Sequence, residues 1–211
     1  MPLDQLRGRG PFQMIFTFQS IPTLVFGLVM TCWLAFAGVF FFRKTPASAP
    51  EQKRARVSIL GVILQGVSYA IVWSLHRPAF SSVASLSHGI EIVVAVGAVA
   101  VACLSVAVVR AAVKTLGREW SVTARLVEGH RLATRGPYRF VRHPIYTGMF
   151  GMLLATGLAT TYWLTLLTAI LVFFIGTIIR IHSEETLLRE QFGSEFEEYA
   201  KRVAALLPGV Y

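Results

Sequence analysis

Residues 136–148 read GPYRFVRHPIYTG and separate the most polar part of the chain from its longest apolar part. The Gly-Pro pair that opens this stretch is typical of a turn. Pro144 disfavours a helical conformation at His143 but suits the first turn of a helix itself. Such a helix start attracts anionic groups. We therefore expect Arg142 and His143 to lie at a helix N-terminus beside a membrane. The alternative is an interfacial anchor, because Arg, His and Tyr are common at membrane boundaries.

The chain downstream of this stretch has no charged residue from Pro144 to Ile179. One helix of this length would extend about 54 Å at about 1.5 Å per residue, far more than a hydrocarbon core of about 30 Å. We therefore predict two helices in a tight hairpin. Its turn is expected at 160–163, where polar β-branched and interfacial aromatic residues cluster. Three glycines would let these helices approach other backbones closely, namely Gly148, Gly151 and Gly157.

Three further apolar runs lie upstream, each close to the roughly 20 residues that a spanning helix needs. They are approximately Thr23–Phe42, Val57–Leu75 and Gly89–Val109, the last continuing as a helix towards Leu116. The first run could be a signal peptide, but it is long for one and is followed directly by Arg43. A retained helix is the better interpretation.

The composition supports a membrane protein, since 55% of the 211 residues are hydrophobic and 15% are charged. The predicted fold class is all-α, an integral membrane protein with five transmembrane helices, the last two in a hairpin, and a cytoplasmic helical tail. Residues 1–211 form a single membrane domain. Its parts are three N-terminal helices in 1–116, and a loop, the hairpin and the tail in 117–211. The two cysteines lie inside apolar runs and are interpreted as packing residues rather than a disulfide or metal site.

The tail beyond Ile179 has the pattern of an amphipathic helix. Ser194 followed by Glu197 matches a capping box, so we predict a helix break at Gly193 and a new helix start. The apolar face recurs at spacings of three or four and comprises Leu188, Phe192, Phe196, Tyr199 and Val203.

The formal net charge of +9 could indicate a nucleic-acid ligand, but the distribution of basic residues favours a membrane explanation. Of the 20 Lys and Arg residues, 17 lie in 43–56, in 110–143 and from Arg180 onward. With five spans these segments share one side, which should be the cytoplasm. We therefore predict no nucleic-acid partner, an outside N-terminus and a cytoplasmic C-terminus. An Ala- and Val-rich chain with short loops suggests a bacterial inner membrane.

This topology would place two sets of polar residues on the same membrane face, where they could line a pocket with apolar walls. Three histidines and two glutamates make a zinc site conceivable, but no pair has the spacing of a helical zinc motif. A Ser/His/Asp hydrolase is poorly supported, because Gly-x-Ser-x-Gly is absent from the sequence. One set is His130, Tyr138, Arg142, His143 and Tyr146, and the other is Arg180, His182, Glu184 and Glu185.

Three features of the C-terminal part resemble the isoprenylcysteine carboxyl methyltransferase family and its bacterial relatives. The first is His-Arg-Leu at 130–132 leading into Gly-Pro-Tyr at 136–138. The second is Arg-His-Pro-Ile-Tyr-Thr-Gly at 142–148. The third is Arg180-Ile181 with Glu184-Glu185, followed by Phe192-Gly193, Tyr199 and Leu207-Pro208. The upstream helices resemble the family in hydropathy alone.

The resemblance implies transfer of a methyl group from S-adenosyl-L-methionine to a lipophilic acceptor, leaving S-adenosyl-L-homocysteine. It implies Arg180 as the catalytic residue that orients an acceptor carboxylate, with Arg142 and Glu185 as further substrate-binding residues. An amide side chain that the family has shortly before the first feature is replaced in this chain by the neighbourhood Val122-Thr123-Ala124. The implied cofactor-binding residues are His130, Arg131, Leu132, Ala133, Tyr138, His143, Pro144, Ile145, Tyr146 and Glu184.

The acceptor is expected to be an isoprenylcysteine-like or other lipid carboxylate, free or attached to a protein. A carboxylate is already ionised at neutral pH and needs no general base. The alternative acceptor is a phospholipid amine, which must lose a proton, with His182 or Glu185 as the candidate base. Two other classes remain open, a nicotinamide-dependent sterol-type reductase on a similar scaffold and a non-catalytic lipid-binding membrane component.

Overall fold

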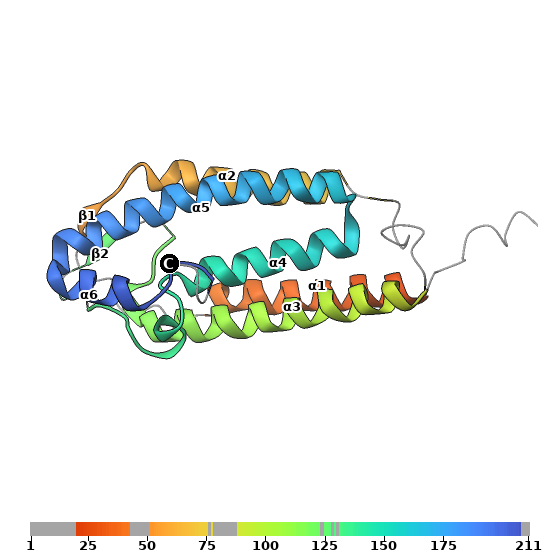
Figure 1. The fold of residues 1–211 in the computed structure, drawn as a ribbon, viewed down its shortest axis with the longest axis horizontal. Coiled ribbons are helices and arrows are strands. Elements are labelled where there is room, and N and C mark those ends of the chain that lie inside the picture. Colours follow the sequence, from red (N-terminus) through yellow and green to blue (C-terminus); the bar gives the residue numbers. More distant parts are fainter. Residues whose placement is uncertain are drawn as a thin grey trace, which may run out of the picture.

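The computed structural model describes residues 20–42, 51–75, 77, 88–122, 125–127, 129 and 131–207. Most of this part of the chain is helical, with one pair of short strands and two short 3₁₀ helices (Figure 1). The elements are α1 Ser20–Phe41, β1 Glu51–Arg54, α2 Ser58–Ser74, α3 His88–Leu116, η2 Gly117–Glu119, β2 Arg125–Val127, η3 Gly136–Arg139, α4 Pro144–Thr160, α5 Trp163–Phe192 and α6 Ser194–Arg202.

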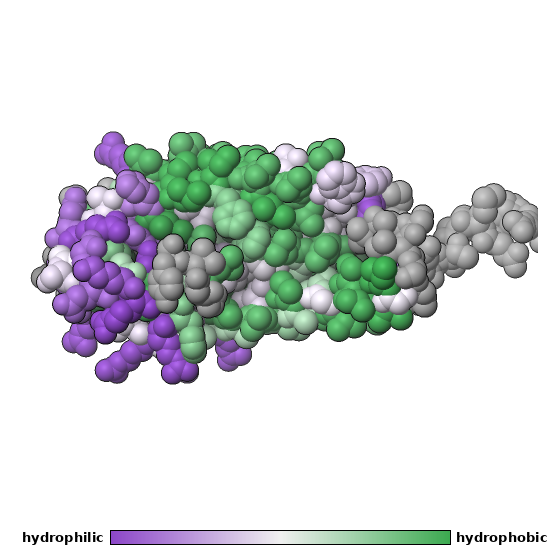
Figure 2. Space-filling view, viewed as in Figure 1, coloured by the Kyte–Doolittle hydropathy of each residue, from purple (hydrophilic) through white to green (hydrophobic). Residues whose placement is uncertain are grey.

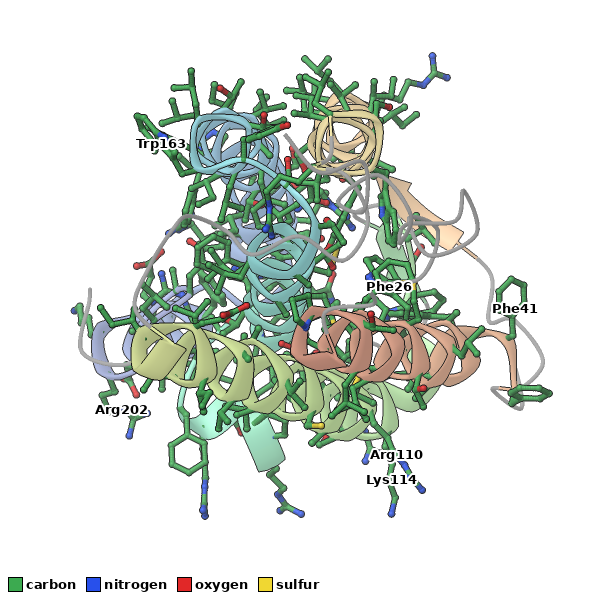
Figure 3. All side chains as sticks on the ribbon, turned by 90° about the vertical axis from the view of Figure 1, so that its right-hand side faces the viewer. Phe26, Phe41, Arg110, Lys114, Trp163 and Arg202 are labelled. Atoms are coloured by element: carbon green, nitrogen blue, oxygen red, sulfur yellow. The ribbon has the colours of Figure 1, made fainter. Side chains whose placement is uncertain are left out.

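Helix α4 lies between two pairs of helices, α2 with α5 on one side and α1 with α3 on the other (Figures 1 and 3). One hydrophobic core joins α1, α3 and α4, and it contains Val29, Ala102, Val109 and Met152. A second core joins α2, α4 and α5 through Val72, Leu153 and Phe173. Because α4 contributes to both cores, the segment that begins at Pro144 is the central element of the fold.

The apolar runs predicted from the sequence all form helices. The predicted hairpin is confirmed, since α4 ends at Thr160 and α5 begins at Trp163. Among the residues that the structure describes, three helices are long and apolar enough to cross a membrane, and apolar side chains cover most of the bundle on the face seen in Figure 2. These are Pro22–Phe41, Gly89–Leu116 and Trp163–Phe192, whereas α2 and α4 have 17 residues each. The chain is therefore a membrane protein, and the full set of five spans stays a prediction.

The hydrophilic residues gather at the end of the bundle that carries α6, β1 and β2 (Figures 1 and 2). There β1 pairs with β2 in an antiparallel arrangement, with Glu51 opposite Val127 and Arg54 opposite Arg125. The prediction of an all-α fold missed this pair, because the strands have only four and three residues and lie within segments that read as loops. The pairing joins the segment before α2 to the segment after α3, so both segments lie at the same end of the bundle.

The chain breaks at Gly193, as predicted, but the capping box is wrong. Gly193 has φ of +51°, a conformation that glycine adopts readily, and it is the N-cap of α6. The backbone amide of Glu197 donates to the Gly193 carbonyl at 3.2 Å, and no side chain caps the helix. Helix α5 continues without a break beyond the uncharged run that ends at Ile179, and its 30 residues end at Phe192, directly before Gly193. Phe196 and Tyr199 are buried on the predicted apolar face.

Glycines set two helix contacts that matter for the site. A Cβ atom at Gly148 would lie 3.0 Å from the Ser105 carbonyl of α3, which confirms the predicted close approach there. A Cβ at Gly61 would lie 2.5 Å from the Gly176 carbonyl, so α2 and α5 touch backbone to backbone at this level. The thiols of Cys32 and Cys103 are free and lie 3.7 Å apart between α1 and α3.

Candidate functional site

His143 is the N-cap of α4, and its backbone is held by a segment far along the chain. Val141 forms a parallel bridge with Ala204, and the His143 amide donates to the Ala205 carbonyl at 3.0 Å. The Arg142 amide donates to the Ala204 carbonyl at 2.8 Å. Pro144 disfavours a helical conformation at the preceding residue, and His143 has a non-helical backbone with φ of −124° and ψ of 60°, which leaves its amide free to pair with Ala205. The segment after α6 therefore fixes the position of the histidine.

The buried imidazole of His143 lies between two carboxylates. Its Nδ1 is 3.3 Å from Glu184 Oε2, and its Nε2 is 3.2 Å from Glu185 Oε1. The ring also stacks on Tyr146, with 5.6 Å between centroids. Burial alone would lower the pKa of His143, but hydrogen bonds and charge interactions with the two glutamates raise it above its ordinary value. Both ring nitrogens face acceptors, so this arrangement favours the imidazolium form.

Arg142 connects the site to the tail. Its Nε donates to Glu185 Oε1 at 2.9 Å, and its NH1 donates to the carbonyls of Ala200 and Val203. Arg189 donates to the other oxygen of Glu185 at 3.0 Å. Arg142 and Glu185 thus use most of their hydrogen-bonding capacity at the junction of α5, α6 and the residues that follow.

A tyrosine pair strengthens the same junction. The hydroxyl of Tyr199 donates to the Tyr138 carbonyl at 2.6 Å. Burial raises the pKa of Tyr199 to about 12, so the hydroxyl keeps its proton at neutral pH. This bond joins α6 to η3, which carries the Gly-Pro-Tyr motif.

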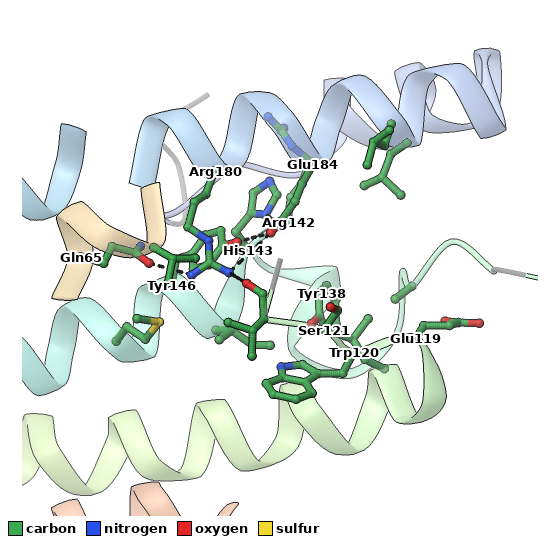
Figure 4. Close-up of a pocket in the computed structure, with 18 of the residues that line it drawn as sticks. Gln65, Glu119, Trp120, Ser121, Tyr138, Arg142, His143, Tyr146, Arg180 and Glu184 are labelled. Atoms are coloured by element: carbon green, nitrogen blue, oxygen red, sulfur yellow. Dashed lines mark hydrogen bonds and ion pairs between the residues drawn. The ribbon is translucent and has the colours of Figure 1, made fainter. Parts of the chain in front are cut away.

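Arg180 and Glu184 lie one turn apart on α5, with Tyr146 beside both. The guanidinium carbon of Arg180 is 4.6 Å from the centre of the Tyr146 ring, and the Tyr146 hydroxyl donates to Glu184. Arg180 NH1 donates to Gln65 Oε1 at 2.7 Å, and NH2 donates to the Val122 carbonyl at 2.5 Å (Figure 4). NH2 is 3.9 Å from Glu184 Oε1, so the predicted pair is in electrostatic contact.

These groups open into a cavity of about 480 Å³. Its volume falls within the range of about 300–1,000 Å³ that is usual for small-molecule sites. Polar and aromatic groups line the part near His143, and largely apolar side chains from α1, α2 and α4 line the remainder. The apolar wall includes Phe36, Phe40, Val62, Tyr69 and Met149.

The structure brings most of the predicted site residues together. Arg131, Pro144 and Glu185 lie outside the cavity lining, and Glu185 instead holds His143 and Arg142. His182 is exposed and is also absent from the lining. His130 falls outside the described residues. The predicted residues in the lining are Leu132, Ala133, Tyr138, Arg142, His143, Ile145, Tyr146, Arg180 and Glu184.

Sequence reasoning missed two parts of the site. Gln65 is a buried amide in α2 that contacts Arg180, and its only signal in the sequence is a polar residue inside an apolar run. The residues after α3 form a second wall, where the side chain of Glu119 accepts from the Arg131 amide at 3.0 Å. This wall comprises Glu119, Trp120, Ser121 and Val122.

Comparison with known proteins shows similarity over the part of the chain that holds these residues. Residues 92–195 match the family model described as phospholipid methyltransferase. A probable protein-S-isoprenylcysteine O-methyltransferase of Oryza sativa subsp. indica is 37% identical over 99 residues, 46% of this chain and 52% of that protein. The protein-S-isoprenylcysteine O-methyltransferase of Schizosaccharomyces pombe is 34% identical over 87 residues, 41% of this chain and 37% of that protein.

A third relative has a different name. The nickel-cobalt-cadmium resistance protein NccN of Alcaligenes xylosoxydans xylosoxydans is 34% identical over 114 residues, 52% of each chain. The chain spans about half the length of these curated relatives, or less. The matched region contains most of α3, all of α4 and all of α5, and therefore His143, Arg180 and Glu184. Residues 92–195 thus match the phospholipid methyltransferase family, and the similar proteins include ones named as isoprenylcysteine O-methyltransferases.

Proposed function

We propose that this protein transfers a methyl group from S-adenosyl-L-methionine to a carboxylate on a lipophilic acceptor in the membrane. The observation that carries the proposal is the position of Arg180. Its buried guanidinium lies over Tyr146 and one helical turn from Glu184, in a cavity that is polar on one side and apolar on the other. A polar donor and an apolar acceptor can therefore both be accommodated close to this residue.

The chemistry of the polar part suits the methyl donor. The donor has an amine, a carboxylate and ribose hydroxyls, and it carries a positively charged sulfur. Glu184 supplies a carboxylate, and Tyr146 fixes it by a hydrogen bond. The backbone amides at the start of α4 favour a negatively charged group. We assign donor binding to this side, with Leu132, Ala133, Tyr138, Ile145 and His130 as further contacts by resemblance.

The charge balance near Arg180 favours an anionic acceptor. Arg142, His143 and Arg180 face the carboxylates of Glu184 and Glu185, which leaves one positive charge in excess when His143 is protonated. Counting Glu119, which also lines the cavity, brings the total to zero, and the pair of Arg189 with Glu197 does not change it. A bound donor adds positive charge to the same cavity. A carboxylate would complete the balance, whereas a protonated amine would oppose it.

The proposed reaction requires alignment more than proton transfer. S-adenosyl-L-methionine, when bound, supplies a methyl group attached to a positively charged sulfur. An acceptor carboxylate is already ionised, so a carboxylate oxygen forms the new bond to carbon while the bond from sulfur to carbon breaks. Arg180 orients that oxygen, and the apolar wall excludes water from it. Positioning of this kind can supply much of the rate of a displacement reaction.

A phospholipid amine acceptor is the second candidate, because the matched family model is described as phospholipid methyltransferase. An amine acceptor must lose a proton to a base near the reacting nitrogen. His182 is exposed and outside the lining, while Glu185 is occupied by Arg142, His143 and Arg189. These positions support the carboxylate acceptor over the amine.

The membrane arrangement is part of the proposal. We propose five spans, an outside N-terminus and a cytoplasmic end of the bundle that holds the cavity, in a bacterial inner membrane. The clustering of hydrophilic residues at the end with α6 supports this orientation (Figure 2).

A two-step experiment tests the function. Calorimetric titration of the purified protein in detergent with S-adenosyl-L-homocysteine should show saturable binding. Vesicles containing the protein and labelled S-adenosyl-L-methionine should then transfer label to an S-farnesylcysteine derivative with a free carboxylate. The methyl ester of the same compound and phosphatidylethanolamine are the controls. Transfer to phosphatidylethanolamine alone would favour the amine reaction, and absence of donor binding would overturn both.

A further inference from the structure

Gln65 is a fully buried amide near the middle of α2, a helix whose other residues are mostly apolar. Its Oε1 accepts from Arg180 NH1 at 2.7 Å (Figure 4). Its Nε2 donates to Thr177 Oγ1 at 2.8 Å. Arginine offers donors only, so the amide oxygen must face Arg180 and the amide nitrogen must face Thr177. Both ends of the Gln65 side chain are therefore fixed by residues of α5.

The guanidinium of Arg180 is restrained on several sides. NH2 donates to the Val122 carbonyl, and the group lies over the Tyr146 ring. Its Nε is buried and has no hydrogen-bond partner among the residues that the structure describes. A buried donor without a partner is costly, so an acceptor that reached this atom would remove that cost. Gln65 thus holds NH1, while Nε keeps unused hydrogen-bonding capacity.

The backbone contact between α2 and α5 makes this arrangement rigid. Gly61 lies one turn before Gln65, and a Cβ there would meet the Gly176 carbonyl. The two helices cannot separate or rotate without losing this contact, so Gln65 has a fixed distance to Arg180. A side chain of different length or charge at position 65 would act directly on the guanidinium.

We propose that Gln65 is a positioning residue that determines acceptor specificity in the methyl transfer proposed above, on which this inference rests. A neutral amide holds Arg180 without neutralising its charge, so the positive charge is kept for the acceptor carboxylate. A carboxylate at this position would form an ion pair with Arg180 and replace the substrate as its anionic partner. Gln65 thus selects a negatively charged acceptor through Arg180, without contacting the reacting atoms.

The test compares two variants of Gln65 in the full-length protein. Gln65→Glu keeps the size of the side chain and adds charge, whereas Gln65→Met removes the hydrogen bonds and adds none. The control is Ser68→Ala, which lies on the next turn of α2 outside the cavity lining and removes only a hydrogen bond to the Gln65 backbone carbonyl, leaving the Gln65 side chain unchanged. For each protein, calorimetry gives the Kd for S-adenosyl-L-homocysteine, and vesicle assays give kcat and KM for the S-farnesylcysteine acceptor.

We expect Gln65→Glu to raise the acceptor KM at least tenfold, with a donor Kd within twofold of the unchanged protein. Gln65→Met should lower kcat/KM about fivefold, again with unchanged donor binding, and Ser68→Ala should behave like the unchanged protein. Wild-type acceptor KM in Gln65→Glu would overturn the inference, as would a parallel loss of donor and acceptor binding in both variants. If the unchanged protein neither binds S-adenosyl-L-homocysteine nor methylates the acceptor, the result contradicts the proposed function rather than the role of Gln65.

Discussion

Glu184 and Glu185 are adjacent in the sequence, yet their carboxylates contact opposite ring nitrogens of the same histidine, at 3.3 Å and 3.2 Å. Neighbouring residues on a helix point about 100° apart, so a ring placed between them can reach both. Glu184 borders the cavity, whereas Glu185 contacts Arg142 and Arg189. His143 therefore connects the cavity to the residues that hold the tail.

This relationship predicts a dependence on pH above neutrality. Protonated His143 donates to both carboxylates, whereas the neutral ring can donate to one only. A raised folded-state pKa means that the stabilisation is fully present below the ordinary histidine pKa of about 6.5 and is lost as pH rises through the raised value. We expect the Tm in detergent to fall as the pH rises above about 6.5 and through the raised pKa of His143.

The control for the pH experiment is the exposed histidine, His182. His143→Gln should flatten the decline of Tm with pH, because its amide does not titrate. His182→Gln should leave the decline unchanged. Equal slopes in the protein and in His143→Gln would show that another group is responsible.

The second prediction concerns the methyl donor and Glu184. Glu184→Gln keeps the shape of the side chain and removes its charge, so binding of S-adenosyl-L-homocysteine should weaken by about 1.5–3 kcal/mol if the carboxylate accepts from a charged amine. Calorimetry measures this directly. The matched control is Glu198→Gln on the exposed face of α6. Unchanged affinity in folded Glu184→Gln would place the donor elsewhere.

The third prediction separates donor from acceptor at Arg180. Arg180→Lys keeps the charge but loses the planar fork that suits a carboxylate and the contacts to Gln65 and Val122. We expect nearly normal donor binding and at least a tenfold slower methyl transfer, a loss of about 1.4 kcal/mol of transition-state stabilisation. Full activity would reduce Arg180 to a membrane anchor. Equal loss of both properties would make it a cofactor or structural residue.

The fourth prediction concerns the side of the membrane on which the cavity opens. Ser194 lies at the start of α6, at the hydrophilic end of the bundle. In a background with Cys32 and Cys103 replaced by Ala, Ser194→Cys should react with a membrane-impermeant maleimide only after cells are opened (Figures 1 and 2). Labelling of intact cells would reverse the proposed topology. It would also contradict the side assigned to 17 of the 20 basic residues.

The helices were predictable because their determinants are local. The uncharged stretch from Pro144 to Ile179 is too long for one spanning helix, so it predicts two helices joined by a turn. Gly193 ends α5 whatever contacts the tail makes. The β1–β2 pair was not predictable, since neither strand has an apolar pattern of its own. It forms because the bundle brings two polar segments to the same end.

The candidate site was predictable for residues that belong to a motif, such as Arg142 and His143 in one motif and Arg180 and Glu184 in another. Gln65 belongs to no motif, and its partner Arg180 is 115 residues away. Its role depends on how closely α2 approaches α5, which the glycines Gly61 and Gly176 determine. The hydrogen bond from Arg180 to the Val122 carbonyl was also not predictable, because every residue type has a backbone carbonyl.

Residues 141–143 pair with residues 203–206, so the motif depends on a segment that is synthesised after it. The carbonyls of Ala204 and Ala205 hold the backbone of Arg142 and His143, and the Leu206 carbonyl accepts from the Thr147 hydroxyl. A ribosome delivers the motif long before it delivers these partners. With the proposed topology, the helical hairpin inserts before these partners are made, so we expect the nascent protein to bind the proposed methyl donor only after α6 has left the ribosome and docked.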